Sequence, residues 1–200
     1  ELPETWNLSH PELIRSIHRA YLNAGCEILT TNTFGANRLK FPEEQLEAVI
    51  AAAVSHAREA VSQCGHPALV AMDIGPTGKL LKPMGDLDFE EAVSAFGQAA
   101  ALGEKNGADL ILIETMSDTL EAKAAVLGAK EHTSLPVFVT MIFDETGKLL
   151  TGGDIPAAVA MLEGLGVDAI GLNCGLGPKQ MLGLLPKLAE CASVPIIVNP

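Results

Sequence analysis

Long apolar runs are missing from this 200-residue chain, and so is any run of lysine and arginine. No stretch approaches the roughly 20 apolar residues that a transmembrane helix needs, and the opening Glu1-Leu2-Pro3-Glu4 is not that of a signal peptide. The 13 basic residues are scattered among 25 acidic ones, and the formal net charge is −12. Nucleic acids and anionic membranes attract clustered positive charge, so neither is expected as a partner.

Cysteine is scarce, and paired-cysteine motifs are absent. The four cysteines, Cys26, Cys64, Cys174 and Cys191, lie far apart and show no CxxC spacing. Without a secretory signal a disulfide framework is not expected, and the chain is predicted to be cytoplasmic. Cys26, Cys64 and Cys191 lie at or near helix ends and are interpreted as small packing residues.

Several familiar site motifs are also absent. No predicted strand leads into GxGxxG or GxxxxGK[ST], so a nucleotide-binding open sheet has no support. No predicted strand ends in a lysine, which argues against a barrel aldolase that works through a Schiff base. The five histidines fall on helices or helix ends, and we interpret them as solvated or capping residues.

What the sequence does contain is a regular alternation of helices and strands, with 48% apolar residues. Six short, continuously apolar segments are predicted as strands, and helical periodicity separates each from the next. Continuous apolar strands indicate a parallel sheet covered on both faces, either an open doubly wound sheet or a closed barrel. The predicted strands are residues 27–33, 68–74, 110–115, 137–143, 167–174 and 195–199.

Polar side chains stand at the carboxyl end of nearly every predicted strand. Chemistry in parallel β/α barrels sits at these ends, so a spread of polar groups over all the strands favours the barrel. A long glycine- and proline-containing loop follows the second strand, over residues 75–86, and is expected to be a binding loop or a mobile surface loop. The strand-end groups are Asn32, Thr33, Asp73, Glu114, Thr115, Asp144, Asn173, Cys174 and Asn199.

Three of these strand ends carry more extended motifs: Thr31-Asn32-Thr33-Phe34-Gly35-Ala36-Asn37, Ile113-Glu114-Thr115 and Gly171-Leu172-Asn173-Cys174. Together they resemble the homocysteine S-methyltransferase domain family, most of all its cobalamin-dependent methionine synthases. The resemblance implies a (β/α)8 TIM-type barrel, of which residues 1–200 supply six of eight units. The first strand, and the last strand with its Cys-Cys segment, would then lie outside these residues.

The resemblance also implies a zinc site. Cys174 matches one of three thiolate ligands, and the other two belong to an adjacent pair in a GGCCG segment that the 200 residues do not contain. A zinc ion with three protein ligands keeps one position open for the substrate sulfur and removes its proton. From the bare sequence, a buried strand cysteine is the favoured interpretation of Cys174, and the matching motifs elsewhere in the chain reverse that order. Asn173, its neighbour, is expected to orient the ligand or to satisfy a loop.

The remaining candidate residues concern the amino-acid part of the substrate. Glu114 ends an apolar strand, and a buried carboxylate needs a partner such as a substrate ammonium group or a neighbouring lysine. By resemblance, Glu114 holds the homocysteine amino group, and Thr31, Asn32 and Thr33 line the pocket and meet its carboxylate. No further side chain is assigned a catalytic role.

The resemblance predicts transfer of a methyl group to homocysteine, forming methionine. The TNTFGANR segment favours methylcobalamin as donor, with folate- and cobalamin-binding modules as partners. Betaine- or S-methylmethionine-type transfer stays open, and so does a non-catalytic barrel remnant, because the cysteine pair is absent. With six of eight strands present, residues 27–33 and 195–199 are expected to form open sheet edges.

Overall fold

Helices and strands alternate along the whole chain, as expected. A computed structural model describes residues 2–200. Within these residues, no helix combines the length and the apolar character that a membrane span requires. The elements are η1 (Pro3–Thr5), α1 (Trp6–Ser9), α2 (Pro11–Asn23), β1 (Ile28–Thr30), α3 (Glu43–Gln63), β2 (Leu69–Ile74), α4 (Phe89–Lys105), β3 (Leu110–Met116), α5 (Thr119–His132), β4 (Val137–Met141), α6 (Ile155–Gly164), β5 (Ala169–Asn173), α7 (Pro178–Cys191) and β6 (Ile196–Asn199).

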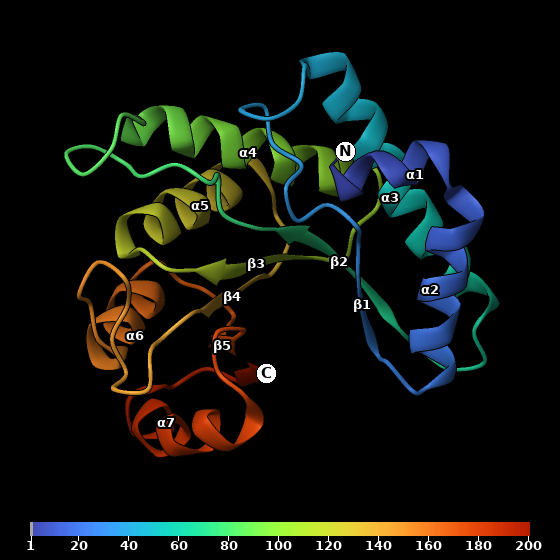
Figure 1. Ribbon diagram of the computed structural model, residues 1–200. Helices are drawn as coiled ribbons and strands as arrows, with labels where there is room; N and C mark the ends of the chain where they lie inside the picture. Colours follow the sequence, from blue (N-terminus) through green and yellow to red (C-terminus); the bar gives the residue numbers. More distant parts are fainter. Residues whose placement is uncertain (1) are drawn as a thin grey trace.

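The six strands form one parallel sheet in the order β1-β2-β3-β4-β5-β6. Each crossover therefore advances by one strand in the same direction, as in a barrel, whereas a doubly wound sheet reverses part-way. The sheet curls into a half-barrel with helices packed around its outside (Figure 1). The predicted incomplete barrel is confirmed.

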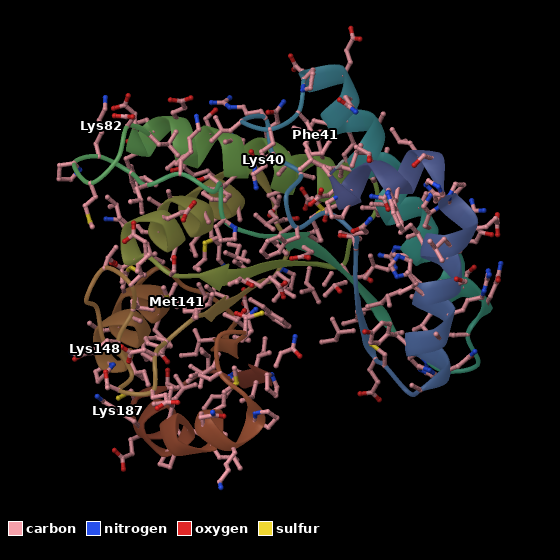
Figure 2. The ribbon with its side chains drawn as sticks, viewed as in Figure 1. Lys40, Phe41, Lys82, Met141, Lys148 and Lys187 are labelled. Atoms are coloured by element: carbon pink, nitrogen blue, oxygen red, sulfur yellow. The ribbon has the colours of Figure 1, made fainter. Side chains whose placement is uncertain are left out.

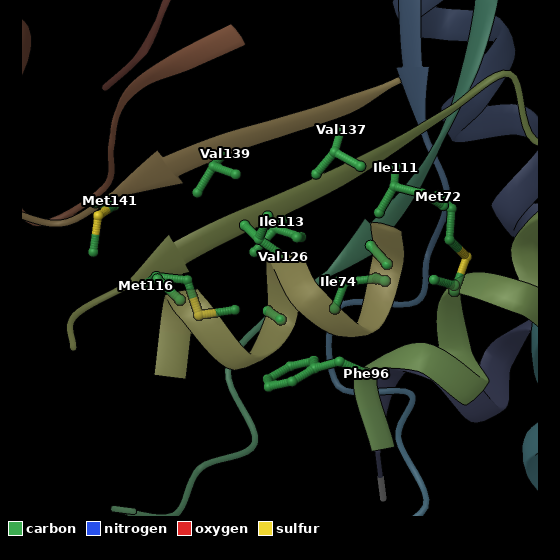
Figure 3. Close-up of a cluster of buried hydrophobic side chains, with 14 of the residues drawn as sticks. Met72, Ile74, Phe96, Ile111, Ile113, Met116, Val126, Val137, Val139 and Met141 are labelled. Carbon is green, nitrogen blue, oxygen red and sulfur yellow. The ribbon is translucent and has the colours of Figure 1, made fainter. Parts of the chain in front are cut away.

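The two faces of the sheet have different surroundings, because alternate side chains of a strand point to opposite sides. Outward-facing side chains pack against α4 and α5 and make the main core, around Phe96 and Val126 (Figure 3). On the inner side, Asp73, Leu112 and Phe138 line a cavity. The outward set includes Met72 and Ile74 of β2, Ile111 and Ile113 of β3, and Val137, Val139 and Met141 of β4.

The first strand is shorter than the sequence predicts. Residues 27–33 were expected to be extended, but β1 covers only Ile28–Thr30. The backbone N–H of Thr31 still donates to the carbonyl of Ala71 at 3.0 Å, whereas that of Thr33 turns back to the carbonyl of Thr31, also at 3.0 Å. Threonine and asparagine favour such local turns over a continued ladder.

The two outer strands are open edges, as expected. Within residues 2–200, β1 pairs only with β2, and β6 pairs only with β5. Apolar side chains on these strands stay exposed, Ile28 at 42% and Val198 at 39%. The half-barrel therefore presents unpaired backbone and apolar surface at both ends of the sheet.

The long loop between β2 and α4 is anchored to the neighbouring helix. The backbone N–H and the hydroxyl of Thr77 both donate to the Glu121 carboxylate on α5, at 2.8 and 2.6 Å. Leu81 and Leu87 are buried and form an isolated bridge. These contacts hold the loop at the carboxyl side of the sheet.

Two histidines correct the expectation of solvated or capping positions. His18 on α2 and His56 on α3 are buried. Neither Nε2 of His18 nor Nδ1 of His56 has a partner within residues 2–200. Burial, with a smaller contribution from His56, lowers the pKa of His18 to about 4. The burial of His18 could have been predicted from the sequence, because Ile14, His18 and Leu22 recur every four residues and share the buried face of α2.

Acid is expected to destabilise the fold through His18. The folded protein keeps His18 neutral down to a pKa of about 4, while the unfolded chain takes up the proton near pH 6.5. The free energy of unfolding should fall as the pH drops from about 6.5 toward 4, by up to about 3 kcal/mol. Urea unfolding of the full-length protein that contains this chain, at a series of pH values, measures this slope. His18→Leu should flatten it, and substitution of the exposed His10 by asparagine should not. Equal slopes in His18→Leu and wild type would contradict the assignment.

Candidate active site at the carboxyl end of the sheet

Cys174 lies at the point where β5 ends. Its backbone is left-handed, with φ 52°, and the next residue, Gly175, has φ 70°. A left-handed conformation is uncommon and costly for a residue with a side chain, and such positions cluster at functional sites. The backbone N–H of Cys174 still donates to the carbonyl of Asn199 on β6 at 3.1 Å. The thiol is exposed, so the reading of Cys174 as a buried strand cysteine is wrong.

Asn173 joins the ends of two strands that are not neighbours. Its buried amide accepts a hydrogen bond from the backbone N–H of Thr115 at 3.0 Å and donates to the Thr115 hydroxyl at 2.7 Å. The same amide nitrogen lies 3.5 Å from the Cys174 sulfur. Thr115 is also left-handed, with φ 65°. The pair of hydrogen bonds therefore ties the end of β3, with Glu114, to the end of β5, with Cys174.

Glu114 is half-buried at a break in the register between β3 and β4, between Ile113 and Met116. Burial raises the pKa of its carboxyl group. Within residues 2–200 no lysine or arginine forms an ion pair with it. Lys82, Lys148 and Lys187 lie at the periphery of the molecule (Figure 2), where the first two pair with aspartates. The pairing with a lysine that the sequence left open is therefore not found.

Asp73 is a second carboxyl group on the inner face, and it is more deeply buried than Glu114. Burial, followed by the nearby carboxylates of Glu114 and Glu4, raises its pKa well above the usual range. Its position at the end of an apolar strand was visible in the sequence, but its burial was not. The carboxyl ends of β2 and β3 thus bring two titratable groups together.

The Thr31-Asn32-Thr33 segment forms hydrogen bonds within the protein. The hydroxyls of Thr31 and Thr33 lie 2.7 Å apart, and that of Thr33 donates to the carbonyl of Asp73 at 2.7 Å. The Asn32 amide donates to the carbonyl of Pro3 at 3.0 Å, and the Asn7 amide donates to the carbonyl of Asn32 at 2.7 Å. These bonds fix the end of β1 against β2 and the N-terminal segment.

A cavity of about 600 Å³ lies on the inner side of the half-barrel. Its apolar walls come from the sheet and from Ile17 and Tyr21 of α2, and its polar lining includes Thr31, Asn32 and Asp73. A pocket that is mostly apolar with a few convergent polar groups is the usual form of a small-molecule site. The cavity is therefore a candidate for the part of the substrate pocket near Thr31, Asn32 and Asp73, whereas Glu114, Asn173 and Cys174 are not among its lining residues.

Metal ligands are fewer than a closed site requires. Among residues 2–200, no three histidine, cysteine, aspartate or glutamate side chains are grouped so that they could hold a metal ion. The exposed Cys174 thiol is a suitable soft ligand, but it stands alone. Residues 2–200 therefore supply one of the ligands that a zinc site needs, the Cys174 thiol.

A family model described as homocysteine S-methyltransferase matches residues 2–200. The chain belongs to this family. It is 35% identical over 212 aligned residues to a methionine synthase from Mycobacterium leprae, and 34% identical over 209 to one from Mycobacterium tuberculosis. Each alignment covers 98% of this chain but only 17% of the relative, so the chain spans about a sixth of these proteins.

The fold of this family member is also found in solved structures. The homocysteine methyltransferase MmuM from Escherichia coli, in its metallated form, has a TM-score of 0.81 at 26% identity. The match covers 98% of this chain and 74% of the MmuM chain. A putative phosphonomutase from Burkholderia cenocepacia, at 17% identity and a TM-score of 0.56, shares the fold alone.

Proposed function

We propose that the protein transfers a methyl group to the thiolate of homocysteine and so forms methionine. The observation that carries this proposal is the Asn173–Thr115 link, which holds the thiol of Cys174 and the unpaired carboxylate of Glu114 at one edge of the sheet. Homocysteine carries a thiol at one end and an ammonium group at the other. This edge of the sheet offers a metal ligand, Cys174, for the first and a carboxylate, Glu114, for the second. Membership of the homocysteine S-methyltransferase family supports the same reaction.

In this proposal the reaction depends on zinc. Cys174 supplies one thiolate ligand, and the other two come from a Cys-Cys segment outside residues 2–200. The domain organisation follows: residues 1–200 form a homocysteine-binding barrel domain that lacks the first strand and the last strand with that segment. Bound zinc would keep the substrate sulfur deprotonated at neutral pH, where a free thiol with a pKa of about 8.5 is mostly protonated. A metallated form of the related MmuM supports a metal in this fold.

Within the chain, Glu114 would hold the substrate ammonium group. The segment from Thr31 to Thr33 would line the pocket and meet the substrate carboxylate. Asn173 would orient Cys174, because its amide lies 3.5 Å from the sulfur and is fixed from the other side by Thr115. No side chain is assigned a proton-transfer step.

The methyl donor is proposed to be methylcobalamin, delivered by another module. The similarity to methionine synthases about six times longer than the aligned region supports folate- and cobalamin-binding modules as partners. A betaine- or S-methylmethionine-type transfer is the second candidate, because the match covers 74% of the MmuM chain and leaves little room there for further modules. A thiolate ligand has to stay reduced, so we place the protein in the cytoplasm.

The proposal is tested on the full-length protein that contains this chain. Zinc content is measured after dialysis, and methionine formation from homocysteine is followed with each of the three donors in turn. Zinc-dependent methionine formation supports the proposal, and the donor accepted separates the candidates. A protein that binds neither zinc nor homocysteine would instead be a non-catalytic remnant.

Glu114→Ala is expected to weaken homocysteine binding by about 2–4 kcal/mol, because the substrate ammonium loses its charged partner. Zinc content should stay at the wild-type value, since the carboxylate is not a ligand in this proposal. Calorimetric titration and metal analysis measure the two effects. Glu131→Ala, on the exposed side of α5, is the control for loss of a carboxylate. Loss of zinc in step with binding would show that Glu114 supports the metal.

A further inference from the structure

Two buried polar atoms on the inner face of the sheet lack a partner. These are Oδ1 of Asp73 on β2 and Oγ1 of Thr140 on β4, neither of which is hydrogen-bonded within residues 2–200. Both side chains are almost fully buried, with exposed fractions of 7% and 2%. A buried polar atom without a hydrogen bond costs about 1–3 kcal/mol, so two of them in one place indicate a position that a ligand fills.

Both side chains lie on the same face of the sheet as Glu114. The sheet register pairs Asp73 with Leu112, and Leu112 with Phe138. Residues two apart on a strand share a face, so Glu114 lies one step beyond Leu112, and Thr140 one step beyond Phe138. Glu114 thus lies diagonally beyond Asp73, close enough to raise its pKa, and Thr140 lies opposite the break in register at Glu114 and Thr115. The three side chains occupy neighbouring positions at the carboxyl end of the inner face.

The charge of these groups selects a cation. Burial raises the pKa of both Glu114 and Asp73, and the mutual proximity of the carboxylates raises that of Asp73 further. Within residues 2–200, neither carboxyl forms an ion pair with a lysine or arginine. A second anion, such as a substrate carboxylate, would be repelled at this position. A positively charged donor would favour the ionised carboxylates and hydrogen-bond to them.

We propose that Asp73 and Thr140 complete the ammonium site of the substrate together with Glu114, an inference that rests on the proposed function. A primary ammonium group has three N–H donors, and three adjacent strands present one acceptor group each. Binding would give both unpartnered atoms a hydrogen bond. Asp73 also lines the inner cavity together with Thr31 and Asn32, two of the residues proposed to meet the substrate carboxylate. Asp73 and Thr140 therefore bind and position the substrate, and selection for a primary amine follows from the count of donors.

Calorimetric titration of the zinc-loaded full-length protein tests this site with two ligands. L-Homocysteine carries the ammonium group, whereas 4-sulfanylbutanoic acid keeps the thiol and the carboxylate and lacks it. Asp73→Asn should weaken homocysteine at least about tenfold and the des-amino ligand less than about twofold. Thr140→Val should weaken homocysteine by about tenfold or more, the value of a hydrogen bond from a charged donor. Asp86→Asn, an exposed site in the loop after β2, should change neither affinity.

The outcomes separate this inference from the function on which it rests. Wild-type protein that does not bind homocysteine would overturn the proposed function and this site with it. Wild-type binding, with Asp73→Asn either unchanged or weakened equally for both ligands, would overturn the role of Asp73 alone. Should Asp73→Asn not fold, Thr140→Val decides, and an equal affinity for homocysteine in that variant and wild type would contradict the site.

Discussion

Cys174→Ser in the full-length protein is expected to abolish both zinc retention and methyl transfer while leaving the fold intact. The thiol is exposed at the end of β5 and takes no part in the core, so a hydroxyl in its place leaves the packing unchanged. A serine hydroxyl does not ionise at neutral pH and cannot replace a thiolate at zinc. Metal analysis, a methionine-formation assay and circular dichroism measure the three properties.

The matched control for this substitution is Cys191→Ser. Cys191 is also an exposed free cysteine, at the end of α7 and away from the strand ends. It should keep wild-type zinc content and activity. Wild-type zinc stoichiometry in Cys174→Ser would remove Cys174 from the metal site. Loss of the circular dichroism signal would instead show a structural role.

Residues 1–200 expressed by themselves are expected to associate and to lack methyltransferase activity. Both edge strands expose unpaired backbone, and α2 leaves Ile17 and Tyr21 exposed at 42% and 64% beside the cavity. Contiguous apolar surface next to open strand edges promotes association. With Cys174 as the one proposed zinc ligand among residues 2–200, the metal site is also incomplete. Size-exclusion chromatography and thermal unfolding should show oligomers and a broad transition.

Charges on the two edges test the cause of this association. The substitutions Ile28→Lys and Val198→Lys place a positive charge on each exposed edge strand. Charged residues on an edge strand oppose pairing with another strand. The double variant should be less associated than wild type, and a lysine at the exposed Leu182 of α7 should make no difference. A longer chain that pairs both edges should be monomeric and active. Monomeric, cooperatively unfolding residues 1–200 with activity would contradict the expectation.

The sequence predicted the fold well because the strands are buried on both faces. Continuous apolar segments such as Leu110–Ile113 require cover on each side, and regular alternation with helices leaves a parallel sheet as the solution. The same pattern placed Glu114 and Cys174 at strand ends on one edge. The main error in a strand was β1, where local hydrogen bonds of Thr31 and Thr33 end the ladder early.

Other features depend on contacts between residues far apart in the chain. Nothing in the spacing of Thr115 and Asn173 indicates that they pair across β4, because the pairing follows from the curl of the sheet and from the left-handed backbone at Thr115 and at Cys174, the residue after Asn173. The unpartnered Oγ1 of Thr140 is likewise visible only in three dimensions. Strand periodicity assigns a face to a residue, but it does not show what lies opposite.

The amino-acid sequence alone therefore determined the parallel β/α class, the strand ends at which the polar groups stand, and the family motifs at Glu114 and Cys174. Local apolar patterning is sufficient for the class and the strand positions, since each strand buries its own side chains, and the family is indicated by the motifs themselves. Only the tertiary structure decided that Asp73 and Thr140 are buried on the same face as Glu114, and that the Cys174 thiol is exposed. Burial and hydrogen-bond satisfaction are set by neighbouring strands, and those neighbours become known only when the sheet is assembled.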